Sequence, residues 1–330
     1  MKIVKSDFGM TAQGELVNLY HIENTSGAYI EVLDYGARVH KIVVPNKDEE
    51  LVNACLSFST VEEYEKDDSY RGSICGRVAN RICKGRFSLN GVDYQLAVNN
   101  GENHLHGGNV GYAYKVWEAS VKDDKLVLVM NSPDGEEHYP GNLTLTVTYG
   151  WSEDNELSIL YEATCDQDTI INVTNHAYFN LNNAEGTILN HELFIDADTI
   201  TPVDETLIPT GEFLPVDGTP FDFRTIRAIG KLIENEDPYF SIVGTYDHNF
   251  AINGTGLREA AVLQSKESGI RMTCFTDQPG LQIYVAPVNT SVCLETQHYP
   301  DSINHENFPS VVLKNGEQFR SKTLYHFSNF

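Results

Sequence analysis

The sequence predicts an all-β protein, an antiparallel sandwich or barrel with a few short helices. Hydrophobic and polar residues alternate along many short segments, as in half-buried strands. Turn dipeptides separate these segments, and no long amphipathic helices recur between them. Regular alternation of strands with long helices would instead predict a parallel α/β sheet. The 330 residues, 41% of them hydrophobic, are enough to bury a large core.

The predicted strands follow from this period-2 alternation. The clearest one covers residues 143–149, where Leu, Val and Tyr alternate with Thr. The other predicted strands cover residues 125–130, 156–161, 170–174 and 281–285. Asn-Gly or Asp-Gly pairs, which favour tight turns, begin at Asn90, Asp134, Asp217, Asn253 and Asn315.

Helical signals are few. Thr60-Val-Glu-Glu63 has the pattern of a capping box and predicts one short helix. Residues 226–233 are a second candidate. The longest irregular segment, 201–223, contains prolines but also hydrophobic residues at intervals. We therefore interpret it as a packed loop and not as a domain boundary.

The strongly acidic composition limits the possible partners. There are 23 Lys and Arg residues against 47 Asp and Glu residues, which gives a net charge of −24. This charge repels phosphate backbones and anionic lipids, so we expect neither nucleic acid nor a membrane as a partner. It also disfavours phosphorylated substrates, whereas neutral substrates meet no such penalty.

Targeting and cysteine patterns predict a cytoplasmic protein. The N-terminal residues lack the apolar core of a signal peptide, and no apolar run approaches 18 residues. The six cysteines show no C-x-x-C spacing. We therefore expect reduced thiols, most of them buried.

Five segments place polar and titratable residues within apolar surroundings: 76–81, 103–108, 174–179, 246–250 and 293–297. His106 precedes two glycines, which allow a ligand to approach the backbone closely. His104 and His106 would share one face of an extended segment and form a possible metal pair. His176 lies among an amide and aromatic residues. Spacing alone favours structural roles for both His106 and His176, although a histidine also suits proton donation near neutral pH.

The remaining candidates are also ambiguous from spacing alone. Glu295 follows an apolar stretch, where it could be a partly desolvated base or a solvent-facing strand residue. Arg81 and Asp247 could form a structural ion pair or contact a polar ligand. Gln282 lies in an alternating strand, with Gln278 nearby as a competing choice.

Signatures of several other enzyme classes are missing. The sequence contains no G-x-S-x-G, P-loop, strand-linked G-x-G-x-x-G or H-E-x-x-H motif. A glycosidase with two catalytic carboxylates remains open, because the many acidic residues supply pairs whose distances a sequence does not show.

At these segments the chain closely resembles the aldose 1-epimerase (galactose mutarotase) family. The matching stretches occur in family order over nearly the whole chain. They are GRVANRI at 76–82, NHLHGG at 103–108, SPDGEEHYPGNL at 132–143, TNHAYFNL at 174–181, TPVDETLIPTGEFLPVDGTPFDFR at 201–224, FTDQPGLQIY at 275–284 and CLETQHYPDSINH at 293–305.

The resemblance implies a single domain over 1–330, a large antiparallel β-sandwich of the galactose mutarotase-like supersandwich type. It implies an isomerase that interconverts the α and β anomers of free hexoses such as galactose and glucose. Glu295 matches the general base, His176 the general acid, and His106 a second active-site histidine that assists at the ring oxygen. The sugar-lining positions match Asn80, Arg81, Tyr178, Asp247 and Gln282.

The chemistry of this reaction needs an acid, a base and no redox change, so we expect no cofactor and no metal. We expect Tyr178, Phe179 or Trp117 to pack against the apolar face of a pyranose. The expected partner is a small neutral sugar, and the expected assembly a monomer or homodimer.

Two segments depart from the family pattern. Residues 111–115 lack a frequent acidic residue, and 285–292 is shorter than in many members. We expect both to border the cleft and to affect substrate preference. The alternatives are a non-catalytic sugar-binding module and a hexose-6-phosphate epimerase. The latter should show a basic cluster, and the nearby basic residues are Arg77, Arg81, Lys84 and Arg86.

Overall fold

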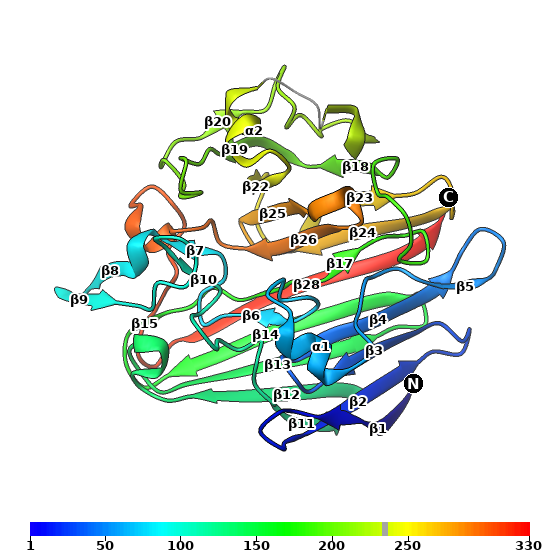
Figure 1. The fold of residues 1–330 in the computed structure, drawn as a ribbon, viewed down its shortest axis with the longest axis horizontal. Helices are drawn as coiled ribbons and strands as arrows, with labels where there is room; N and C mark the ends of the chain where they lie inside the picture. Colours follow the sequence, from blue (N-terminus) through cyan, green and yellow to red (C-terminus); the bar gives the residue numbers. More distant parts are fainter. Residues whose placement is uncertain (233–236) are drawn as a thin grey trace.

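The computed structural model describes residues 1–232 and 237–330 and confirms the all-β prediction. Most of its strands belong to three antiparallel sheets of nine, six and five strands. The last strand, β28, crosses the middle of the molecule, with β12–β14 on one side of it and β23 and β24 on the other (Figure 1). Among the described residues, no helix has the length and apolar character needed to cross a bilayer.

The nine-stranded sheet is the layer on which the other two sheets pack. Its order is β11(Glu118–Lys122), β12(Lys125–Ser132), β13(Leu143–Trp151), β14(Glu156–Cys165), β28(Gln318–Asn329), β24(Ile270–Thr276), β23(Arg258–Gln264), β18(Glu192–Ile195) and β21(Arg227–Ala228). The predicted strands 125–130, 143–149 and 156–161 are confirmed as β12, β13 and β14. In β13 buried and more exposed positions alternate from residue 143 to 148, as the Leu/Thr pattern predicted.

The five-stranded sheet is a meander that covers the β12–β14 half. It comprises β1(Lys2–Met10), β2(Leu16–Glu23), β3(Tyr29–Leu33), β4(Arg38–Pro45) and β5(Leu51–Asn53). Two buried side chains of β13 reach this layer. The Tyr149 hydroxyl donates to the Ala37 carbonyl at 2.6 Å, and Trp151 Nε1 donates to the Ala28 carbonyl at 3.0 Å. Both aromatic residues thus pack in the core without leaving a polar atom unpaired.

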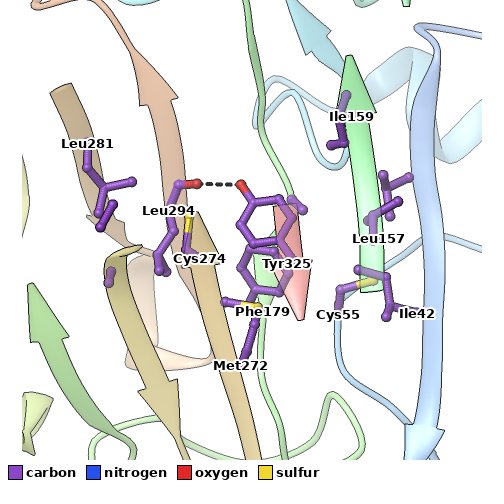
Figure 2. Packing of buried hydrophobic residues seen from close by; sticks show 14 of the residues in the cluster. Ile42, Cys55, Leu157, Ile159, Phe179, Met272, Cys274, Leu281, Leu294 and Tyr325 are labelled. Carbon is purple, nitrogen blue, oxygen red and sulfur yellow. Dashed lines mark hydrogen bonds between the residues drawn. The ribbon is translucent and has the colours of Figure 1, made fainter. Parts of the chain in front are cut away.

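The six-stranded sheet packs against the β28 and β24 half. Its order is β17(Tyr178–Phe179), β26(Val292–Gln297), β25(Gly280–Val285), β22(Asp247–Ile252), β19(Ala197–Thr201) and β20(Leu214–Pro215). The predicted strand 281–285 is confirmed as β25. Figure 2 shows the Tyr325 hydroxyl of β28 donating to the Leu294 carbonyl of β26 across the packed layers, at 2.8 Å. The side chains of Val292 and Leu294 pack in the hydrophobic core, so one face of β26 belongs to the core.

Four short strand pairs lie outside these three sheets. They are β6(Ile74–Cys75) with β16(Thr174–Asn175), β7(Arg81–Ile82) with β10(His104–Leu105), β8(Arg86–Leu89) with β9(Val92–Gln95), and β15(Thr169–Ile170) with β27(Val312–Leu313). The Asn90-Gly91 turn joins β8 to β9, and both of its residues have positive φ, as a two-residue hairpin requires.

The predicted single strand 170–174 is wrong. Residues 169–170 pair with β27, whereas 174–175 pair with β6 in another sheet. All five predicted residues are buried, so their apolar character does not report one continuous half-buried strand.

The predicted helix after Thr60 is confirmed as α1(Val61–Lys66), with both hydrogen bonds of the capping box. The prediction of a helix over 226–233 is wrong for its described part. Residues 227–228 form β21, and η3(Ile229–Leu232) is a 3-10 turn. The backbone amides of residues 229 and 230 donate to the carbonyls of residues 191 and 189 instead of to a helix. Ile233 lies outside the described residues. A helix that we did not predict, α2(Pro238–Val243), is capped by Asp237. The other 3-10 turns are η1(Cys83–Gly85), η2(Glu136–His138), η4(Pro287–Asn289) and η5(Ser302–Asn304).

The segment 201–223 is a packed loop, as predicted. It contains the short strand β20 and buries hydrophobic side chains at Val203, Ile208, Val216, Phe221 and Phe223. All six cysteines are free thiols and five of them are buried, which also agrees with the sequence.

Candidate active site

A cleft forms where the β22–β25–β26 part of the six-stranded sheet meets the loops around β7, β10 and β16. Its cavity has a volume of about 180 Å³. The lining residues are Asp68, Ser69, Tyr70, Asn80, Arg81, Asn100, Leu105, His106, His176, Tyr178, Asp247, Tyr284 and Glu295. All the catalytic and sugar-lining residues that the family resemblance implies lie here except Gln282.

Glu295 projects from β26 on the face opposite the core. The side chain of its neighbour Leu294 belongs to the hydrophobic core, so strand alternation turns Glu295 toward the cleft. The side chain is only 2% exposed, which excludes the reading as a solvent-facing strand residue. Glu295 Oε1 lies 3.6 Å from His176 Nε2, and Oε2 has no hydrogen-bond partner among the described residues. One carboxylate oxygen is thus available to a ligand.

His176 lies in the short connection between β16 and β17. Its ring is 5% exposed, with Nε2 toward Glu295 and Nδ1 3.5 Å from Cys293 Sγ. Cys293 and Glu295 are two residues apart on β26 and therefore share one face of that strand. Both ring nitrogens of His176 consequently face groups of the same strand.

His106 is held differently, by the backbone of Asn80. The Asn80 amide donates to His106 Nδ1 at 3.1 Å, and the His106 amide donates back to the Asn80 carbonyl at 3.1 Å. Since Nδ1 accepts a hydrogen bond, the single proton of a neutral imidazole must be on Nε2. A protonated ring would carry a second proton on Nδ1, directed at the Asn80 N–H. The geometry therefore holds His106 neutral, with Nε2 as a fixed donor.

Burial dominates the electrostatics of all three groups. It raises the pKa of Glu295 well above its usual value, with Asp247 adding to the rise and Arg81 opposing it. Burial lowers the pKa of His176 to about 4, and it lowers the pKa of His106 well below the usual value, helped by His176 and Arg81. Glu295 and His176 thus favour sharing one proton between them. A buried carboxylate with a raised pKa is a stronger base than an exposed one.

The reactive atoms of His106, His176 and Glu295 all lie within 4.8 Å of one another, close enough to hold a metal ion. The tautomer of His106 does not suit this use. A histidine that binds a metal through Nε2 carries its proton on Nδ1 and donates it to an acceptor. Here a backbone donor occupies that position. The other metal pair considered, His104 with His106, is wrong: His104 Nδ1 bonds to the Ala97 carbonyl and Nε2 to the Tyr139 hydroxyl.

A polar cluster borders this centre. Arg81 NH1 lies 3.7 Å from Asp247 Oδ2, and Gln282 Nε2 donates to Asp247 Oδ1 at 2.6 Å. Gln282 does not line the cavity itself. It lies opposite Glu295 in the β25–β26 register and contacts the cleft through Asp247. The competing residue Gln278 bonds to His298 and lines a different cavity.

The aromatic wall differs in part from the sequence prediction. Tyr178 lines the cleft and donates to the Ser69 carbonyl at 2.8 Å, but Phe179 and Trp117 belong to the hydrophobic core. Tyr70 and Tyr284 line the cleft instead. Alternation in β25 places Tyr284 on the same face as Gln282 and could have identified it. Tyr70 lies in an irregular loop with a φ of 55°, and no local pattern marks it.

The two segments that depart from the family pattern, 111–115 and 285–292, do not line the cavity, contrary to the expectation. Tyr114 reaches the site only indirectly, through a ring contact of 5.6 Å with Tyr70. Of the four basic residues considered for a phosphate, Arg81 alone lines the cleft. Arg77 is 1% exposed and bonds to Ser132 and the Pro140 carbonyl, and Arg86 lines another cavity.

The cleft therefore combines a buried carboxylate, a histidine that can gain and lose a proton at Nε2, and a second histidine that can only donate. Such a set can remove a proton from one oxygen of a bound molecule and supply a proton to another nearby oxygen. Its polar rim offers donors and acceptors for hydroxyl groups.

Comparison with known proteins gives consistent matches. A family model described as aldose 1-epimerase matches residues 18–326. The chain is 39% identical to the galactose mutarotase of Sus scrofa, covering 91% of both chains. It is 33% identical to the aldose 1-epimerase of Escherichia coli (strain K12), covering 96% of this chain and 97% of that one.

Solved structures show the same fold. The galactose 1-epimerase from Lactobacillus acidophilus NCFM has 29% identity and a TM-score of 0.88, covering 100% of this chain and 99% of that one. An aldose epimerase homologue from C. elegans has 28% identity and a TM-score of 0.86, covering 95% and 99%. The antiparallel sandwich is thus of the galactose mutarotase type.

Proposed function

Because the chain belongs to the aldose 1-epimerase family and is itself an aldose 1-epimerase (mutarotase), we propose that it interconverts the anomers of free hexoses such as galactose and glucose with Glu295 as base and His176 as acid. The observation that carries these roles is the convergence of Glu295, His176 and His106, whose reactive atoms lie within 4.8 Å of one another.

The reaction proceeds by opening and closing the sugar ring. Glu295 removes the proton from the C1 hydroxyl while protonated His176 gives its Nε2 proton to the ring oxygen. The bond from C1 to the ring oxygen breaks and C1 becomes an aldehyde carbon. After rotation about the C1–C2 bond the roles reverse, and the ring closes on the other face. The enzyme ends with the protons it began with.

The two histidines have different proposed roles because the partners of their Nδ1 atoms differ. His176 can carry protons on both nitrogens and so suits the acid. His106 stays neutral because Asn80 donates to its Nδ1, so its Nε2–H supports the ring oxygen by a hydrogen bond.

The remaining site residues are proposed to hold the sugar. The support is that Arg81, Asn80, Asp247 and Tyr178 all line the cleft. We propose that they contact hydroxyls or the sugar ring. We assign Gln282 a role through Asp247, which it orients by the 2.6 Å hydrogen bond.

A direct test is polarimetry of fresh α-D-glucose and α-D-galactose with and without the protein. We expect the approach to anomeric equilibrium to accelerate for at least one of these sugars. No acceleration with any aldose would refute the proposal and leave the non-catalytic sugar-binding reading.

The charge of the cleft leads to a second expected result, on substrate class. Among the described residues that line it, Arg81 is the one cation, against the carboxylates of Asp68, Asp247 and Glu295. We therefore expect kcat/KM for glucose 6-phosphate to be at least about tenfold below that for glucose. The comparison is made by anomer-resolved NMR at one ionic strength, and equal or higher values for the phosphate would favour a hexose-6-phosphate epimerase.

The pKa directions predict the pH profile of kcat/KM. The Glu295–His176 pair is active while it holds one proton, so activity falls when the pair gains a second. Because burial lowers the pKa of His176 to about 4, that second proton binds only as the pH falls well below 6.5. We expect the midpoint of the acid limb below pH 6, after subtraction of the rate without enzyme. A midpoint at the ordinary histidine value would contradict this assignment.

We further propose one domain over 1–330, present in the cytoplasm as a monomer or homodimer. The family match over 18–326 supports the single domain, and the buried free thiols support the cytoplasmic location.

A further inference from the structure

Cys293 is a buried thiol that the reaction described above does not use. It lies on β26, two residues before Glu295, and is 0% exposed. Its Sγ lies 3.5 Å from His176 Nδ1, a normal distance for a hydrogen bond that involves sulfur. Its other neighbours in the hydrophobic cluster are Tyr178 and Ala286, with Tyr284 and Leu56 packed at the edge.

Among the described side chains around His176, Cys293 is the one with a polar atom within hydrogen-bond distance of Nδ1, and the ring also interacts with the His176 backbone. Nε2 faces Glu295, and the ring contacts with His106, Tyr70, Tyr178 and Tyr284 are made through ring faces or edges. The titratable and charged groups around the ring are Glu295 and Cys293 on β26, Asp247 on β22, Tyr284 on β25, Tyr178 on β17, and His106, Tyr70 and Asp67 on the surrounding loops.

We propose that Cys293 is a positioning residue for His176, whose sulfur accepts a hydrogen bond from Nδ1–H and so reserves Nε2 for proton exchange with the sugar. This inference rests on the proposed role of His176 as the acid. Throughout the reaction the Nδ1 proton stays in place, while the Nε2 proton moves to the ring oxygen and returns.

The choice of sulfur has a chemical consequence. Many active sites place a carboxylate at Nδ1, which stabilises the protonated imidazole. The Cys293 thiol remains neutral, because burial and the nearby Glu295 raise its pKa well above the usual value. A neutral sulfur is a weak acceptor. It fixes the orientation of the ring but stabilises the protonated form only slightly, which leaves His176 a strong proton donor.

The test compares Cys293→Ala, which removes the acceptor, with Cys293→Ser, which supplies an oxygen acceptor. For Cys293→Ala we expect kcat to fall about five- to tenfold, the effect of one hydrogen bond. We expect KM to change less than twofold, because the thiol does not line the cavity. Cys293→Ser should restore kcat to within about threefold of the wild type.

The pH profile separates positioning from simple packing. Without an acceptor the protonated ring is less stable, so the acid limb of kcat/KM should move to lower pH in Cys293→Ala. A hydroxyl oxygen accepts more strongly than sulfur, so the limb should move to higher pH in Cys293→Ser. The nitrogen chemical shifts of His176 in labelled protein should report the proton on Nδ1 in both the wild type and Cys293→Ser.

Cys274→Ala is the matched control, because Cys274 is an equally buried thiol in β24 that packs among core side chains (Figure 2). It should lower thermal stability without moving the pH profile. Unchanged kcat and pH profiles in both Cys293 variants would overturn the proposal. So would equal losses in the two with no shift of the acid limb, which would indicate packing alone. A wild type that does not accelerate mutarotation would instead refute the proposed function.

Discussion

Glu295→Gln is expected to lower kcat at least about a hundredfold, the scale of general base catalysis. The amide is nearly isosteric with the carboxylate but does not take a proton from the C1 hydroxyl. Asp247 does not replace it, since its two oxygens face Arg81 and Gln282. Because the site retains its other polar groups, we expect KM to change much less than kcat. Polarimetry with galactose and glucose gives both constants.

The control for this variant is Glu306→Gln, which removes a carboxylate charge at an exposed position outside the cleft. It should behave like the wild type. If Glu295→Gln retained wild-type turnover, the base would have to be another group, even though the family assignment would stand.

His176→Ala is expected to lower kcat by a similar factor, at least about a hundredfold, because it removes the proton donor to the ring oxygen. His106→Ala is the informative comparison. It removes a hydrogen-bond donor that stays neutral, so its loss should be smaller than that of His176→Ala. Equal losses in the two variants, measured in the same assay, would contradict the division of roles between the two histidines.

The sequence predicted the sheets best where burial alternates. In β13 apolar and polar residues face opposite sides, and the pattern identified the strand to within two residues. Residues 170–174 are buried throughout, so their composition could not show that the chain leaves one sheet and enters another. The 3-10 turn after residue 228 is set by backbone bonds to residues 189 and 191, which local sequence does not encode.

The candidate site depended on the family resemblance and not on spacing. Local spacing favoured structural roles for His106 and His176. It could not show that they lie close together, because they come from two loops far apart in the sequence. Tyr70 was missed for the same reason: its contacts with His106 and His176, at ring distances of 4.6 and 6.4 Å, are made only in the folded chain. The His106 tautomer was equally inaccessible, since its partner is a backbone amide.

That backbone partner bears on how the enzyme can evolve. The donor to His106 Nδ1 is the main-chain N–H of residue 80, which every amino acid except proline supplies. Most single substitutions at this position therefore leave the donor in place. They replace the Asn80 side chain that lines the cleft and put at risk the loop conformation that aims the donor, which has a φ of 60° at Asn80. The protonation state of His106 is thus insensitive to most substitutions at its hydrogen-bond partner. The partners of His176 are side chains, which substitution can change.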